Sequence, residues 1–367
     1  MTAVQAAPAP TPQGSERRAF QTLDGLRGVG AGLVVMRHVP SMFGGVHVPE
    51  SFLAVDLFYL VSGFVVAHAY AERLKAGGFL VPFVKTRIIR LYPLYAAGLA
   101  VGVISALISI LGDPHGWWSW ARLAEALAAG LILFPFVPGL DANGSSLDGP
   151  TWTLLPEIIA NAVYAALIRW MKPWVLVVIA AVSAVGVVKA ELLYGTLDVG
   201  YNSWDFWTAL ARVGFSFFAG VLVFRYFGDR RIQSDWASWG AVLVLGAILA
   251  GSPDDDWVAA YELGAVMVAF PLLLIAAAHF EPGPRAGAAF SKIGLVSYGV
   301  YILHQPMGNL ARSAISNWPA LKPHSGWISG VLFMGVVGGL AWWLDDHYDA
   351  PVRKMLRAKF LAKPAKG

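Results

Sequence analysis

Apolar residues run along this chain in long stretches with few polar interruptions. Each stretch is about 18 to 22 residues, the length that an α-helix needs to cross a hydrocarbon core roughly 30 Å thick. Ten membrane-spanning helices are predicted, at residues 20–40, 50–70, 91–111, 151–170, 173–189, 206–226, 237–250, 258–278, 292–311 and 326–344. The predicted fold class is all-α, a polytopic transmembrane helical bundle of about ten spans.

An eleventh apolar stretch, residues 123–137, differs from the others. It is shorter, it begins near Arg122 and Glu125, and it ends in a run that contains two prolines. A stretch of this kind is typical of an interfacial or re-entrant segment rather than of a full crossing. We therefore expect ten spans plus one short segment.

Basic residues fix the expected orientation, because cytoplasmic connections retain Lys and Arg. With the first span leaving the cytoplasm, the outer connections hold only Arg122, Lys189, Arg312 and Lys322, and all other Lys and Arg between spans fall inside. A full crossing by residues 123–137 would reverse every later connection and place Arg169, Lys172, Arg225, Arg230 and Arg231 outside. Both termini are accordingly predicted to be cytoplasmic, with a disordered lead at 1–19, one membrane domain at 20–344 and a basic cytoplasmic tail at 345–367.

Composition narrows the class further. Hydrophobic residues make up 57% of the chain, charged residues only 14%, and the mean hydropathy is +0.59, which excludes an ordinary soluble domain. The absence of cysteine excludes disulfides and thiolate chemistry. The net charge of +4 is explained by basic cytoplasmic connections, so nucleic acid is not an expected partner.

Ionisable and polar side chains within the predicted spans are the informative exceptions. An Arg, Lys or Asp at mid-membrane costs about 2.5–3.5 kcal/mol on insertion scales, so such groups are expected to pair or to line a polar chamber. The spans contain Arg27, His38, Asp56, His68, Glu157, Asn161, Arg212, Glu262 and His304. A buried polar chamber is predicted.

The spacing of these residues indicates how the chamber is arranged. Arg27 and His38 are eleven positions apart, close to three helical turns, so they share one helix face and are expected to line a single cavity. Arg87 and Arg90 lie one turn apart and form a candidate phosphate clamp. The alternatives are that Arg27 reaches the lipid headgroups, that His38 caps a helix, and that the arginine pair only reflects cytoplasmic charge.

Two further polar groups recur at helical spacing. Thr153 and Glu157 are one turn apart, and a histidine in the same chamber would be oriented by the Glu157 carboxylate and made more basic by it. Later in the chain, Ser297, Tyr298, Tyr301 and His304 place hydroxyl and imidazole groups on one side of a helix. The alternative for the tyrosines is an aromatic belt at the membrane interface.

Six segments in this order resemble the acyltransferase-3 family of integral membrane O-acyltransferases. They are Leu23 to Gly28 followed by His38, Val55 to Phe64, Arg87 with Arg90, Trp152-Thr153 to Glu157, Arg212 to Gly220, and Ser297-Tyr298 to His304. Thr153 stands where the family usually has serine, which keeps the hydroxyl, and Pro156 before Glu157 is atypical. The chain resembles the branch of the family that has no fused esterase-like domain.

The resemblance implies an activity and a set of roles. Acetyl-CoA or another short acyl-CoA would bind with its phosphates on Arg87, Arg90 and Arg27, and no metal is expected. His38 would act as general base or accept the acyl group transiently, and Glu157 would orient it. Substrate or oxyanion contacts are expected from the remaining polar residues of the chamber: Asp56, Thr153, Arg212, Tyr298 and His304.

The expected acceptor is a sugar hydroxyl of an extracytoplasmic or lipid-linked glycan, which places the protein in a bacterial inner membrane among lipids. The competing hypothesis is a transporter or lipid flippase without acyl-transfer chemistry, because buried ionisable groups also mark transport pathways. The absence of an inverted repeat favours the acyltransferase. Acetylation of a membrane acceptor would separate the two.

Overall fold

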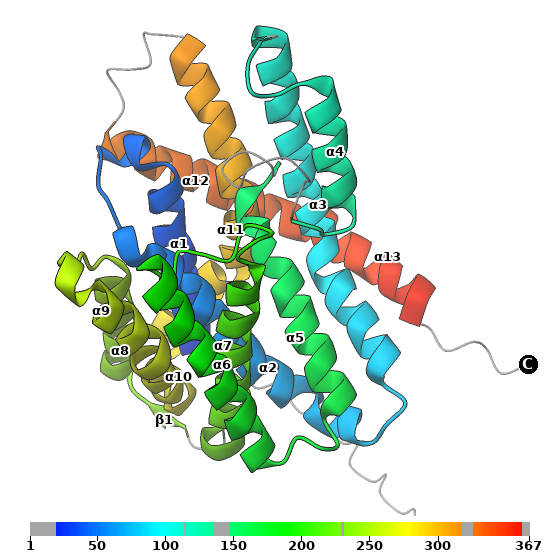
Figure 1. Ribbon diagram of the computed structural model, residues 1–367, viewed down its shortest axis with the longest axis vertical. Helices are drawn as coiled ribbons and strands as arrows, with labels where there is room; N and C mark the ends of the chain where they lie inside the picture. Colours follow the sequence, from blue (N-terminus) through cyan, green and yellow to red (C-terminus); the bar gives the residue numbers. More distant parts are fainter. Residues whose placement is uncertain (1–19, 114, 136–146, 229–230, 318–325, 362–367) are drawn as a thin grey trace, which may run out of the picture.

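The computed structural model describes residues 20–113, 115–135, 147–228, 231–317 and 326–361, and it is a bundle of helices (Figure 1). The α-helices are α1 (Gln21–His38), α2 (Ala54–Lys75), α3 (Leu80–Gly112), α4 (Trp120–Leu131), α5 (Leu154–Leu167), α6 (Pro173–Tyr194), α7 (Phe206–Phe227), α8 (Asp235–Leu249), α9 (Val258–Gly264), α10 (Phe270–His279), α11 (Pro284–Asn317), α12 (Trp327–Leu344) and α13 (Ala350–Leu361). Short 3-10 turns lie at Pro40–Phe43, Pro49–Leu53, Gly149–Thr153 and Asp255–Trp257. Two short strands, β1 (Ile232–Gln233) and β2 (Phe280–Glu281), pair in parallel.

Helical structure occurs at each of the ten predicted spans, which confirms the helical membrane class. Within the described residues, seven helical segments are long and apolar enough to cross a membrane. The helices at the other three predicted spans are shorter or more charged: α5 has 14 residues, α8 has 15, and α1 carries Asp24, Arg27 and Arg37. The number of spans and the side on which the termini lie therefore stay predictions. The predicted lead at 1–19 lies outside the described residues.

The predicted short segment at 123–137 contains α4, and residues 136–137 lie outside the described part of the chain. This helix has 12 residues, which is a rise of about 18 Å, well short of the hydrocarbon core. It packs on the upper half of α3, and this pair extends from the bundle at the top of Figure 1. Ser119 caps α4 by accepting a hydrogen bond from the Arg122 amide.

Two helices widen into a π turn just before a proline. The π segments cover Ala265–Ala269 and Asp345–Asp349, and in each case a proline, Pro271 or Pro351, follows two residues after the segment. Proline has no N–H and its ring clashes with the carbonyl four residues earlier, so the helix must loosen there. The second π turn lets helical structure continue from α12 into α13, across the boundary of the predicted tail.

Glycines bring the central helices into close contact. A Cβ added to Gly63 in α2 would lie 1.9 Å from the Phe217 carbonyl oxygen in α7, and one added to Gly220 would lie 2.0 Å from the Leu60 carbonyl oxygen. In α1, a Cβ added to Gly25 would lie 3.0 Å from the Phe290 side chain of α11, and one added to Gly28 would lie 2.9 Å from the Ile293 side chain. The α1 glycines therefore allow close packing of α1 against α11.

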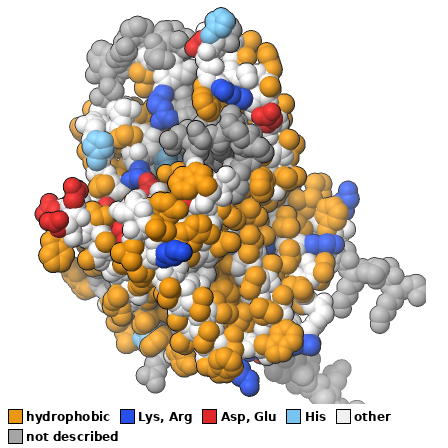
Figure 2. Space-filling view, viewed as in Figure 1, with side chains coloured by type: hydrophobic (Ala, Val, Ile, Leu, Met, Phe, Trp, Pro, Cys, Tyr) orange, Lys and Arg blue, Asp and Glu red, His pale blue; other side chains and the backbone are white. Residues whose placement is uncertain are grey.

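The outer surface of the bundle is largely apolar, as lipid contact requires. Figure 2 shows hydrophobic side chains over most of the lower part of the molecule, and Lys and Arg side chains both at its right and lower edges and on its upper part. The exposed acidic run Asp254–Asp256 lies just before α9.

Candidate functional site

A cavity lined by both charged and apolar side chains lies between α1, α2, α3, α5 and α11. Its volume is about 200 Å³. Six of the ten residues predicted as site residues line it: Arg27, Arg87, Arg90, Thr153, Glu157 and Tyr298. The predicted buried chamber is therefore present, and the sequence motifs from five separate helices or turns meet there.

The Arg87 guanidinium and the Glu157 carboxylate form the central ion pair of the cavity. Arg87 Nη2 donates to Glu157 Oε1 at 2.7 Å, and the Ser62 hydroxyl donates to the same oxygen at 2.6 Å. Only 14% of the Arg87 side chain and 17% of the Glu157 side chain are exposed. Arg87 Nε is buried from solvent and has no hydrogen-bond partner within the described residues, which is an unfavourable state for a guanidinium donor.

Two more arginines add positive charge to the cavity wall. Arg27 lies 3.6 Å from Asp24, one helical turn away, and both side chains are about one-third exposed. Arg90 lies 3.9 Å from the buried Asp349, which also pairs with Arg353 at 2.9 Å. Since each of these ion pairs is partly open or long, Arg27 and Arg90 keep donors toward the cavity.

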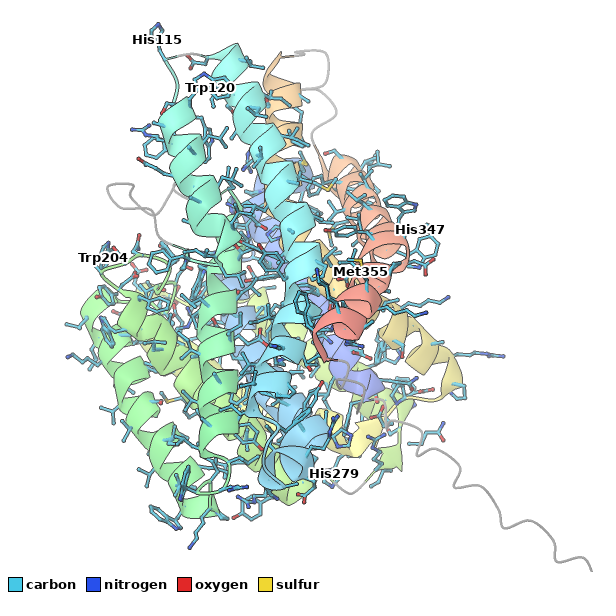
Figure 3. The ribbon with its side chains drawn as sticks, turned by 90° about the vertical axis from the view of Figure 1, so that its right-hand side faces the viewer. His115, Trp120, Trp204, His279, His347 and Met355 are labelled. Atoms are coloured by element: carbon cyan, nitrogen blue, oxygen red, sulfur yellow. The ribbon has the colours of Figure 1, made fainter. Side chains whose placement is uncertain are left out.

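Asp349 reaches Arg90 because the C-terminal helix lies against α3. Figure 3 shows α13, where Met355 is labelled, lying alongside α3, and the two helices are in contact. The Asp349 side chain is fully buried, although the residue lies beyond the predicted end of the membrane domain at residue 344. Asp349 lies in the predicted basic tail at 345–367, and the sequence pattern gives no sign of its contact with Arg90.

His38 does not lie beside Glu157, and the expected contact between them is wrong. The side chain that contacts the His38 ring is His304, whose Nε2 lies 3.2 Å from His38 Nδ1. Glu157 instead neutralises Arg87, because a buried guanidinium that cannot lose its proton needs a charged partner more than a neutral imidazole does. His304, predicted as a substrate or oxyanion contact, is fully buried behind His38.

The prediction that Arg27 and His38 line one continuous cavity is also wrong. Arg27 lines the cavity, but His38 and His304 do not. Tyr301 lies between the cavity and the histidines. Its ring is in edge contact with Phe58 on the cavity wall, and its centre is 6.0 Å from that of the His304 ring. The side chains of Tyr301 and Phe58 fill the space between the cavity and the two histidines, although Arg27 and His38 lie on one face of α1.

Tyr301 is held in this place by hydrogen bonds to the start of α5. Its hydroxyl donates to the Pro150 carbonyl at 2.9 Å and lies 3.1 Å from Thr153 Oγ1. Thr153 Oγ1 also donates to the Pro150 carbonyl, and the Tyr298 hydroxyl donates to the Leu91 carbonyl at 2.8 Å. The predicted hydroxyl groups therefore face the cavity while bonded to backbone carbonyls.

Asp56 and Arg212, predicted as substrate or oxyanion contacts, form a buried ion pair outside the cavity lining. Arg212 Nη2 donates to Asp56 Oδ2 at 2.6 Å, and Nε lies 3.2 Å from both carboxylate oxygens. Arg212 Nη1 donates to the Val199 carbonyl at 2.9 Å. The pair holds α2 against α7, so we revise the expected role of Asp56 and Arg212 from substrate contact to structural support.

Ser62 is a site residue that the residue-by-residue prediction missed. It lies in the Val55 to Phe64 segment and bonds the central carboxylate. A hydroxyl in the middle of an apolar span was the available signal, since it indicates a polar neighbour in the bundle. Across the described residues, no group of three or more His, Asp or Glu side chains has a metal-binding arrangement.

Comparisons with known proteins identify what this chain is similar to. A family model described as an acyltransferase domain, that of the acyltransferase-3 family, matches residues 20–344. The chain is also similar to "Protein 2 in picA locus" of Rhizobium radiobacter, with 43% identity over 183 residues that cover 45% of this chain and 91% of that protein. No solved structure matches the chain significantly.

Proposed function

Because the chain belongs to the acyltransferase-3 family, whose model spans residues 20–344, we propose that it moves an acetyl or other short acyl group from acyl-CoA to a hydroxyl. The donor would enter from the cytoplasmic side, where the basic residues collect, and the acceptor would be an extracytoplasmic or lipid-linked glycan. The family supports an integral membrane acyltransferase. We propose in addition the identity of the acyl donor, the identity of the acceptor, and the side of the membrane from which the donor enters.

One observation carries the proposal: three arginine side chains, those of Arg27, Arg87 and Arg90, line a single cavity. Three guanidinium groups around one cavity suit a polyanion such as the phosphates of CoA. Glu157 pairs closely with Arg87, whereas Arg27 and Arg90 have longer ion pairs, with Asp24 at 3.6 Å and with Asp349 at 3.9 Å.

The size of the cavity supports a short acyl group. At about 200 Å³ it is smaller than the roughly 300–1,000 Å³ pockets that enclose a whole drug-sized ligand. It therefore has room for the acyl and thioester end of the donor, while the phosphates would lie by Arg27 and Arg90, whose side chains are 32% and 37% exposed.

The acyl group can pass from CoA to the acceptor in one step or in two. The acceptor oxygen attacks the thioester carbonyl carbon, the carbon–sulfur bond breaks, and the hydroxyl proton passes to His38 and then to the departing CoA thiolate. In the two-step form, His38 Nε2 attacks the thioester carbonyl carbon and CoA leaves as a thiolate. The acceptor oxygen then attacks the same carbon, the imidazole leaves, and the hydroxyl proton of the acceptor passes to the thiolate. In both forms the rings of Tyr301 and Phe58 must move aside for the thioester to reach His38.

Acetyl transfer from radiolabelled acetyl-CoA to membrane material tests the proposal. Arg87→Lys keeps the charge opposite Glu157 but loses the planar fork, and we expect it to raise the KM for acetyl-CoA about tenfold or more, as a charged hydrogen bond is worth roughly 1.5–3 kcal/mol. Lys85→Gln is the matched control, because Lys85 is an exposed residue of the same helix; its KM should be that of the unaltered protein.

Two results would overturn the proposal. One is an unchanged KM in Arg87→Lys. The other is the behaviour of a carrier, in which labelled material crosses the membrane without any acceptor becoming acetylated. His38→Gln gives the complementary measurement: loss of general-base help should reduce the rate by about 10² to 10⁴.

A further inference from the structure

The hydrogen bonds of His304 fix which of its ring nitrogens carries the proton. His304 Nδ1 lies 2.7 Å from the Tyr301 carbonyl oxygen and 3.2 Å from that of Val300. A carbonyl oxygen can only accept, so the proton is on Nδ1. A neutral imidazole has one such proton, which leaves the lone pair of His304 on Nε2.

The same reasoning then applies to His38. Its Nδ1 lies 2.9 Å from the Val34 carbonyl oxygen and 3.2 Å from His304 Nε2. Both neighbours are acceptors, the first because it is a carbonyl and the second because its lone pair faces His38. His38 Nδ1 must therefore carry the proton, and His38 Nε2 has the lone pair.

We infer that His304 is a positioning residue, which together with the Val34 carbonyl holds His38 in the tautomer that leaves Nε2 as its reactive nitrogen. The inference rests on the proposed acyl transfer at His38. It assigns His304 a place beside the reaction without contact to substrate, in keeping with its fully buried side chain.

The arrangement also supports the charge that develops during the reaction. When His38 Nε2 takes a proton or an acyl group, the ring becomes cationic, and its Nδ1–H then donates more strongly to the His304 lone pair. The charged groups that face His38 are Arg37 and Arg312, with Asp198 paired to Arg37. No carboxylate bonds the His38 ring in the described part of the chain, so the neutral His304 supplies the side-chain acceptor that a carboxylate supplies in other dyads.

The test replaces His304 in two ways in the full-length protein. His304→Leu removes the acceptor, whereas His304→Gln can return an oxygen near the position of Nε2. His347→Leu is the matched control, because His347 is an exposed histidine that stacks on Trp343. Size-exclusion profiles in detergent identify variants that fold.

Two measurements are made on each variant. The first is the pH dependence of His38 carbethoxylation by diethyl pyrocarbonate, followed by peptide mass spectrometry, because this reagent attacks the unprotonated ring nitrogen and needs no acceptor substrate. The second is the kcat and KM for acetyl transfer from acetyl-CoA to membrane material. A purely structural role of His304 would change the amount of folded protein but not the pH midpoint.

We expect His304→Leu to move the midpoint of His38 to lower pH by about one to two units, the worth of one hydrogen bond to a charged ring. Its kcat should fall about ten- to a hundredfold with the KM for acetyl-CoA unchanged, and His304→Gln should recover most of both. A midpoint and kcat like those of the unaltered protein in His304→Leu would overturn the inference, as would a His304→Gln protein that behaves like the leucine variant.

The proposed function can fail separately. If His38→Gln retains full acetyl transfer while His304→Leu still shifts the midpoint of His38, the positioning contact stands and the catalytic role of His38 is lost.

Discussion

The buried ion pair between α2 and α7 gives the sharpest test of how this bundle is held together. Asp56 is fully buried and Arg212 is 1% exposed, and three guanidinium contacts reach the carboxylate. Removing one partner of such a pair costs about 3–5 kcal/mol, because an uncompensated charge stays buried. Asp56→Asn is the most severe change, since the arginine left behind cannot lose its proton.

The double variant separates charge from packing. Arg212→Met leaves a carboxyl that can take up a proton, so it should cost less than Asp56→Asn. Combining Asp56→Asn with Arg212→Met removes both charges and should recover a large part of the loss, which a double-mutant cycle measures as a positive coupling. Lys75→Met is the control, because Lys75 forms an exposed ion pair with Glu72 that should be worth under about 1 kcal/mol.

Thermal unfolding in detergent, followed by size-exclusion chromatography after heating, measures these effects. A loss of about 3–5 kcal/mol corresponds to a fall in Tm of roughly 5–10 °C for a chain of this size. The reasoning is refuted if Asp56→Asn costs no more than Lys75→Met. It is also refuted if Asp56→Asn keeps its Tm but loses acetyl transfer, which would return Asp56 to the catalytic site.

The remaining predictions concern packing and pH. Gly63→Ala should lower the Tm at a cost of about 1–3 kcal/mol, because its Cβ would overlap the Phe217 carbonyl oxygen. Gly335→Ala should be neutral or stabilising, because no atom lies within 4 Å of the added Cβ. Equal Tm values for the two variants would contradict this reasoning. Burial raises the pKa of the Asp148 carboxyl well above its usual value, so the folded protein keeps a proton that the unfolded chain loses, and stability falls as the pH rises above the ordinary aspartate pKa. The Tm of Asp148→Asn minus that of the unaltered protein should therefore increase from pH 4 to pH 8, and a difference that does not vary with pH would refute the assignment.

Several of the family's sequence motifs turn out to support packing rather than chemistry. The Val55 to Phe64 and Arg212 to Gly220 segments meet at the interface of α2 and α7, where Asp56 pairs with Arg212 and both Gly63 and Gly220 allow backbone contact. Ser62, in the first of these segments, faces the cavity instead. One helix thus presents a structural face and a site face from adjacent residues.

The sequence by itself determined the membrane class, the position of every predicted helix and the presence of a polar chamber. These follow from local properties, because the length of an apolar stretch and the cost of a charge in lipid depend on the residues themselves. It also indicated that Arg27, Arg87, Arg90, Thr153, Glu157 and Tyr298 belong together, as the cavity lining shows.

Only the tertiary structure decided which polar group meets which. Helical spacing states that two residues share a face, but not which neighbour that face meets, so the partners of Glu157 and His38 could not be read from the chain. In the folded protein Glu157 neutralises Arg87, His304 contacts His38, and Tyr301 separates the histidines from the cavity. Those choices depend on helix crossing and side-chain volume, which place residues more than 60 positions apart in contact.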